Sequence, residues 1–72
     1  MRKYSVFAQR LFEGEYGEYV TYGICYSYKN YTVEISDLSI DRDSVEEFCN
    51  LLNLHDIEPS SLDELVEDFL AK

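Results

Sequence analysis

At 72 residues the chain is long enough for one small domain, near the lower limit for folding without disulfides or metals. Its content of 46% hydrophobic and 29% charged residues is typical of a globular protein and argues against intrinsic disorder. The formal net charge of -9 argues against direct binding of nucleic acid, because an acidic surface repels the phosphate backbone.

The acidic residues are concentrated in the second half of the chain. Residues 41–72 contain ten acidic residues against Arg42 and Lys72, whereas residues 1–40 have a net charge of only -1. One interpretation is a solvated surface that keeps an aromatic-rich domain soluble. The other is a surface that mimics nucleic acid and inhibits a basic partner protein.

The sequence does not have the pattern of a membrane anchor or a secretion signal. No stretch approaches the roughly 18 to 20 consecutive apolar residues that cross a membrane. The apolar residues that follow Lys3 are interrupted by Gln9 and Arg10, which break any signal-peptide core. We therefore expect a cytoplasmic protein without membrane contact, in which Cys25 and Cys49 remain thiols.

The segment 3–12, KYSVFAQRLF, is rich in strand-forming residues. Both of its alternating faces contain apolar side chains, so the pattern predicts a strand without indicating which face is buried. The next six residues, EGEYGE, place Gly14 and Gly17 among charged residues and predict a hairpin loop.

The segment 19–28, YVTYGICYSY, predicts a second strand with a clear core face. The residues assigned to this face are Val20, Tyr22, Ile24, Tyr26 and Tyr28. Gly23 interrupts the run and indicates a bulge or a close approach of another group to the backbone. The dipeptide Lys29–Asn30 predicts a tight turn, because Asn tolerates positive φ.

The segment 31–37, YTVEISD, alternates in the manner of a half-buried third strand. Tyr31, Val33 and Ile35 are expected to face the core, and the residues between them to face solvent. Strands that follow one another through short turns form an antiparallel meander.

The apolar spacing changes after residue 40 to the i, i+3, i+4, i+7 pattern of an amphipathic helix. The residues in this pattern are Val45, Phe48, Cys49 and Leu52. Asp41 or Asp43 is expected to cap the N-terminus of the helix. Asn53 is expected to end the helix in a left-handed conformation.

A second amphipathic helix is expected towards residue 72. Pro59 suits a first-turn position, and Ser60 or Ser61 is expected to cap the helix. The apolar stripe of this helix consists of Leu62, Leu65, Val66, Phe69 and Leu70. In a chain this short we expect the stripe to pack on the sheet and the first helix, with Phe69 buried as its bulkiest member.

Together these elements predict an α+β fold for a single domain that spans residues 1–72. A three-stranded antiparallel meander is followed by two helices packed on one face of the sheet, in the order β-β-β-α-α. The chain then has no further element to cover the other face of the sheet, which displays residues of the first two strands.

Four stretches follow one another in an order that is found in a known family. They are TYGI, ISDLSIDRDSVEEF, CNLLNL, and LDELVEDFL after Pro59. The chain resembles, over roughly residues 4–70, a family of small uncharacterised bacterial proteins with a domain-of-unknown-function label. The resemblance implies a free-standing cytoplasmic domain of Gram-positive anaerobes and their mobile elements, and no activity, ligand or catalytic residue. The chain departs from the family at Ser60 and Ser61, where a Pro and a His are expected.

No recognised catalytic or cofactor-binding motif is present. His55, beside Asp56, lacks further ligands at a recognised spacing for a metal site, so we expect a solvated loop residue. Cys49 belongs to the apolar stripe of the first helix, and Cys25 to the small-residue face of the second strand. The three glycines are scattered and form no phosphate-binding loop. We expect no enzymatic activity, no cofactor and no metal.

The uncovered sheet face is the preferred candidate for a binding surface, because exposed apolar faces mark interaction sites. Its partner-binding residues are predicted to be Phe7, Leu11, Tyr19 and Cys25. We expect a non-catalytic interaction or regulatory module that binds a protein partner, with self-association as a homodimer as the specific hypothesis. The alternative is an acidic inhibitor of a basic partner, whose binding would weaken at high salt.

Overall fold

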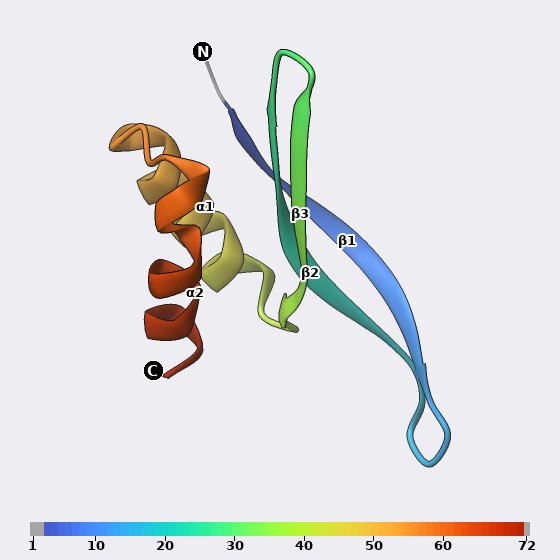
Figure 1. Cartoon of the computed structure of the whole chain (residues 1–72). Helices are drawn as coiled ribbons and strands as arrows, with labels where there is room; N and C mark the ends of the chain where they lie inside the picture. The colour runs from blue at the N-terminus through green and yellow to red at the C-terminus, as the bar shows by residue number, and fades with distance from the viewer. Residues whose placement is uncertain (1–2, 72) are drawn as a thin grey trace.

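The computed structural model describes residues 3–71, which form three strands followed by two α-helices (Figure 1). The elements are β1 (Tyr4–Glu13), β2 (Gly17–Tyr28), β3 (Tyr31–Ser39), α1 (Arg42–Leu54), the 3-10 helix η1 (Pro59–Ser61) and α2 (Leu62–Leu70). This order confirms the predicted α+β fold of a meander followed by two helices.

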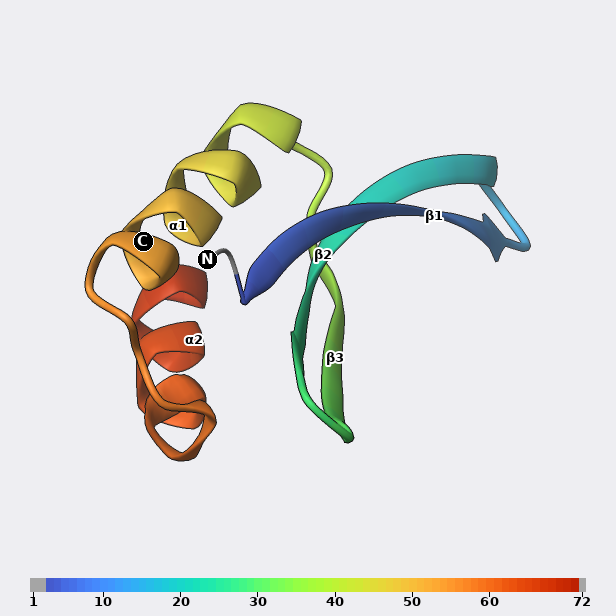
Figure 2. The same ribbon diagram turned by 90° about the horizontal axis from the view of Figure 1, so that it is seen from above.

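The strands form an antiparallel sheet in the order β1-β2-β3. β1 pairs with β2 along its whole length, whereas β3 pairs with β2 only from Tyr22 onward among the described residues. The first half of β2 therefore pairs with β1 alone. Residues 9–21 form a two-stranded hairpin, named the arm below, that extends away from the helices (Figures 1 and 2).

The pairing of β2 with β3 is irregular beside Gly23. Asp37 lies at the centre of a bulge in β3, with a φ of 55°. A β-carbon placed on Gly23 would lie 2.8 Å from Cζ of Phe7 and closer still to the carbonyl oxygen of Ile35. The predicted close approach at Gly23 is confirmed, because a larger residue would displace one of these two groups.

Both helices lie on the same side of the sheet (Figure 2). α1 contacts all three strands. Its N-terminus is capped by Asp41, as predicted, because the carboxylate accepts hydrogen bonds from the N–H of Asp43 and the hydroxyl of Ser44. α2 returns alongside α1, and the ring of Phe69 stacks on the ring of Phe48 with their centres 4.8 Å apart.

The core lies between α1 and the part of the sheet that the helices cover. Buried apolar side chains come from every strand and both α-helices: Tyr4, Ile24, Tyr26, Leu38, Val45, Cys49, Leu52 and Leu62. Cys49 is a core residue, as predicted. Phe69 was expected to be buried but is half-buried, because its ring borders a solvent-open groove between the two helices.

The core face predicted for β2 is wrong at both ends of the strand. Ile24 and Tyr26 are buried and Tyr22 is half-buried, but Val20 and Tyr28 are exposed. The reason is a mismatch of length, because the 12 residues of β2 extend about 40 Å and the 13 residues of α1 extend about 20 Å. A helix of this length covers only the middle of the strand.

The hairpin between β2 and β3 also differs from the prediction. Tyr31 was expected to face the core but is exposed, since it lies at the end of the sheet beside the turn. The turn residue with positive φ is Lys29, at 55°, in place of Asn30. In this conformation the Lys29 ammonium lies 5.4 Å from the centre of the Tyr28 ring, a cation–π contact.

The ends of the helices agree with the sequence only in part. Asn53 was predicted to end α1, but the helix continues to Leu54 with His55 as its C-cap residue, because the side chain of Asn53 binds the backbone of β1 instead. Pro59 begins η1, as expected for a first-turn proline. Ser61 occupies the N-cap position of α2 but makes no capping hydrogen bond with its side chain.

Candidate functional site

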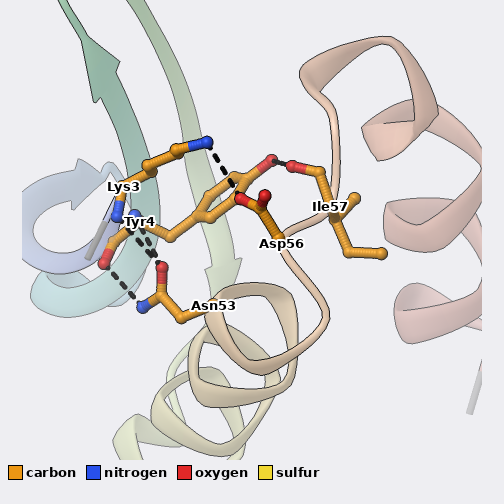
Figure 3. Close-up of polar contacts among 5 residues, drawn as sticks. All are labelled: Lys3, Tyr4, Asn53, Asp56 and Ile57. Atoms are coloured by element: carbon orange, nitrogen blue, oxygen red, sulfur yellow. Dashed lines mark hydrogen bonds and ion pairs between the residues drawn. The ribbon is translucent and has the colours of Figure 1, made fainter. Parts of the chain in front are cut away.

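The start of β1 is joined to the end of α1 by the side chain of Asn53 (Figure 3). Its Oδ1 accepts hydrogen bonds from the backbone N–H groups of Tyr4, at 2.9 Å, and Lys3, at 3.2 Å. Its Nδ2 donates to the carbonyl oxygen of Tyr4, at 3.0 Å. The amide thereby occupies the place that a neighbouring strand would take beside Tyr4.

Tyr4 and Lys3 bind the loop that follows α1. The hydroxyl of Tyr4 donates to the carbonyl oxygen of Ile57, at 2.5 Å, and burial raises the pKa of Tyr4 to about 12. The ammonium of Lys3 lies 2.9 Å from the carboxylate of Asp56, whose hydrogen bond raises the pKa of Lys3. The raised pKa keeps the Tyr4 hydroxyl protonated, so it remains a hydrogen-bond donor. The cluster of Lys3, Tyr4, Asn53 and Asp56 therefore serves as a structural joint between the sheet and α1.

The four predicted binding residues lie on one face of the sheet, opposite the helices. Leu11 pairs directly with Tyr19 on the arm, while Phe7 pairs with Gly23 and Cys25 with Ser5 nearer the core. Residues that alternate along paired strands share a face, so these positions form one surface, named the open face below. The prediction that they share a face therefore agrees with the register.

The open face is partly covered by its own side chains near the centre of the sheet. The ring of Phe7 is half-buried and lies over Gly23. Oε1 of Gln9 accepts a hydrogen bond from the N–H of Asp37 at 3.1 Å, so this side chain crosses β2 to reach the bulge. Thr21, opposite Gln9, is fully buried. Of the four predicted residues, Tyr19 on the arm is therefore the most accessible, at 36% exposed.

Three exposed apolar residues of the arm were not predicted as binding residues. Phe12 is 78% exposed and Val20 42% exposed on the face opposite Leu11 and Tyr19, and Tyr16 at the tip is 83% exposed. Val20 had been assigned to the core and Tyr16 to a loop. The sequence contains a signal for this exposure. Gly14 and Gly17 mark the turn, and β1 has apolar residues on both of its alternating faces, a pattern that indicates a hairpin with two unburied faces.

A second surface lies between α1 and α2. It is a groove of about 500 Å³ between the two helices. The groove is lined by Phe48, Leu51, Leu52, His55, Ile57, Leu65, Asp68 and Phe69. Leu51 on its rim is 48% exposed. The groove is therefore mainly apolar, within the most acidic part of the chain.

Comparison with known families gives a match over nearly the whole chain. The model of DUF6514, a family of unknown function, matches residues 2–72. The chain belongs to this family. No curated protein and no solved structure matches the chain. Membership of DUF6514 confirms the expected family of unknown function, and it assigns no activity to any residue.

Within residues 3–71, this DUF6514 chain contains no group of three His, Cys, Asp or Glu side chains arranged to hold a metal ion. His55 is exposed at the C-cap of α1, where its backbone N–H donates to the carbonyl oxygen of Leu51 at 3.1 Å. Over the same residues, no helix has the length and apolar character required to span a membrane.

Proposed function

We propose that this DUF6514 protein is a non-catalytic protein-interaction module of the bacterial cytoplasm that associates with a second copy of itself through the arm. One observation carries the proposal: the arm extends beyond the helices and exposes large apolar side chains on both of its faces. The bacterial and cytoplasmic setting rests on the sequence pattern and the resemblance described above.

The structure of the arm favours burial against another surface. An isolated two-stranded hairpin is only marginally stable in water, because it has no third strand or helix to cover its side chains. Within the described residues, neither edge of the arm pairs with another strand. Unpaired strand edges pair readily with a second chain. Contact with a partner would bury the exposed side chains and pair one of these edges.

A second copy is a suitable partner for the arm. A two-fold interface uses the same patch twice, so the exposed rings of one arm meet equivalent rings of the other. The arm extends away from the helices, which belong to the half of the chain with a net charge of -8, while Glu13, Glu15 and Glu18 against Arg10 give the arm itself a net charge of -2. Arg10 and Glu18 lie 3.7 Å apart and offset each other's charge, so the net charge of the arm comes from Glu13 and Glu15 near its tip.

Sedimentation velocity at tens of micromolar protein tests the proposal. We expect the wild-type chain to sediment as a dimer of the 8.5 kDa polypeptide. Phe12→Lys and Leu11→Lys introduce the same charge at adjacent positions on opposite faces of the arm. The variant that shifts the protein to monomer identifies the face in contact, and a shift with both variants indicates that both faces are buried.

Ile40→Lys is the matched control, because Ile40 is an exposed apolar residue outside the arm. This variant is expected to remain dimeric. A monomeric wild-type protein, or equal loss of the dimer in the control and in the arm variants, would contradict the proposal, because the arm would then have no specific role in association.

A further inference from the structure

We infer that the groove between α1 and α2 binds a basic amphipathic helix of another protein. This surface lies apart from the arm and does not depend on self-association. The floor of the groove is formed by apolar side chains of both helices, including the stacked rings of Phe48 and Phe69. A solvent-open apolar groove of this kind is the usual receptor for the apolar side of a helix.

Carboxylates flank the groove along both helices. On α1, Glu47 borders a smaller hollow that adjoins the groove at Phe48 and Phe69. On α2, Asp68 lines the groove itself, and Glu64 lies one helical turn before it on the same side. An apolar floor between two acidic rims matches a helix that has a leucine-type stripe with Lys or Arg on either side.

The charges around the groove favour a different protein over a second copy. In α1 and α2, Arg42 is the one basic residue, apart from His55 at the C-cap of α1. Arg42 lies 3.4 Å from Glu46 and borders a hollow at β1, so it is directed away from the groove. Docking the acidic helices of one copy onto those of another would place like charges together.

A helical occupant also suits the walls of the groove better than an extended one. Both walls are α-helices, whose backbone groups are bonded within the helix and cannot pair with an added strand. Side chains on one face of a third helix would instead enter the groove, contact Leu51 and Leu65, and form a three-helix arrangement with α1 and α2.

Fluorescence anisotropy with a synthetic Leu/Lys peptide tests this inference. The probe is a labelled peptide of about 18 residues whose leucines recur with helical spacing. A scrambled peptide of the same composition keeps the charge but loses the apolar stripe. We expect the amphipathic peptide to bind the full chain about tenfold more tightly than the scrambled peptide, since only the former fills the groove.

Matched variants separate the groove from the general acidity of the protein. The pair Glu64→Gln/Asp68→Asn removes two charges on the groove side of α2, and Asp63→Asn/Glu67→Gln removes two on its other side. We expect the first pair to weaken peptide binding about fivefold and the second to have little effect. All four positions are exposed, so both variants retain the fold.

Leu51→Ser should weaken binding by removing apolar contact, while Leu70→Ser, at a residue that is 57% exposed and outside the groove, should not. Phe12→Lys on the arm should bind the peptide as the wild type does, so failure of self-association leaves this test intact. Equal binding of the two peptides, equal effects of the two charge pairs, or no effect of Leu51→Ser would each overturn the inference.

Discussion

Asn53 binds three backbone groups at the start of β1 through one side-chain amide. Asn53→Ala removes all three hydrogen bonds, and we expect it to lower the free energy of unfolding by about 1 to 3 kcal/mol. Asn50→Ala, on an exposed position of the same helix, is the matched control for helix propensity. Denaturant unfolding measures the free energy of unfolding of both variants. Equal values for Asn53→Ala and Asn50→Ala would show that the hydrogen bonds of Asn53 contribute nothing to stability.

Tyr4 provides a pH-dependent contribution to stability at the same joint. Its pKa is raised from 10.0 to about 12, so the folded state favours the neutral phenol. The contribution is fully present below pH 10 and is lost as the pH rises towards 12. We expect the thermal midpoint of Tyr4→Phe to fall less steeply over this interval than that of the wild type. If the thermal midpoints of the wild type and Tyr4→Phe fall equally over this pH interval, the Tyr4 hydroxyl does not have this role.

The sequence can show that a residue is under a steric constraint, but it does not show which distant residue is in contact with it. The interruption of a strand by Gly23 indicates a close contact, and the structure supplies Phe7 and Ile35 as the groups in contact. The role of Asn53 could not be predicted in the same way. Its partner Tyr4 lies 49 residues away, and no local periodicity indicates a hydrogen bond between a helix side chain and a strand edge.

At the scale of elements, α2 is attached to the molecule largely through its apolar stripe. Phe69 stacks on Phe48 but is only half-buried. We therefore expect Phe69→Ala to lower the free energy of unfolding by about 2 kcal/mol, which is less than the same change lowers it at a fully buried site. Leu70→Ala, at an exposed position one residue later, should cost much less. An unchanged denaturation midpoint for Phe69→Ala would show that the stacked ring does not hold α2 in place.

The existence and order of the elements follow from periodicity, which is a local property of the chain. Alternation predicts the strands, and the i, i+3, i+4 spacing predicts both helices. Coverage of one element by another depends on their relative lengths and positions. Val20 and Tyr28 have the alternation of core residues, yet both lie beyond the reach of α1 and are exposed. This mismatch produces the arm, and the alternation of β2 alone does not show where α1 stops covering the strand.

Across the whole molecule, the two exposed apolar surfaces, the arm and the groove, lie in halves of the chain that differ in net charge. The arm lies in the half with a net charge of -1, and the groove lies in the half with a net charge of -8. The candidate site could be predicted in part, because Leu11 and Tyr19 were placed on a common face. Phe12 and Tyr16 were missed, since their exposure depends on where the helices end relative to the sheet.

Comparison by sedimentation velocity of wild-type protein with the double variant Leu11→Lys/Phe12→Lys, which places a charge on each face of the arm, is the most direct test of the proposed self-association, with both proteins at the same concentration in the tens of micromolar. We expect the wild type to sediment as a dimer of the 8.5 kDa chain and the variant as a monomer, because at least one lysine would place a charge in the buried contact. Identical sedimentation of the two proteins, whether both are monomeric or both dimeric, would contradict it.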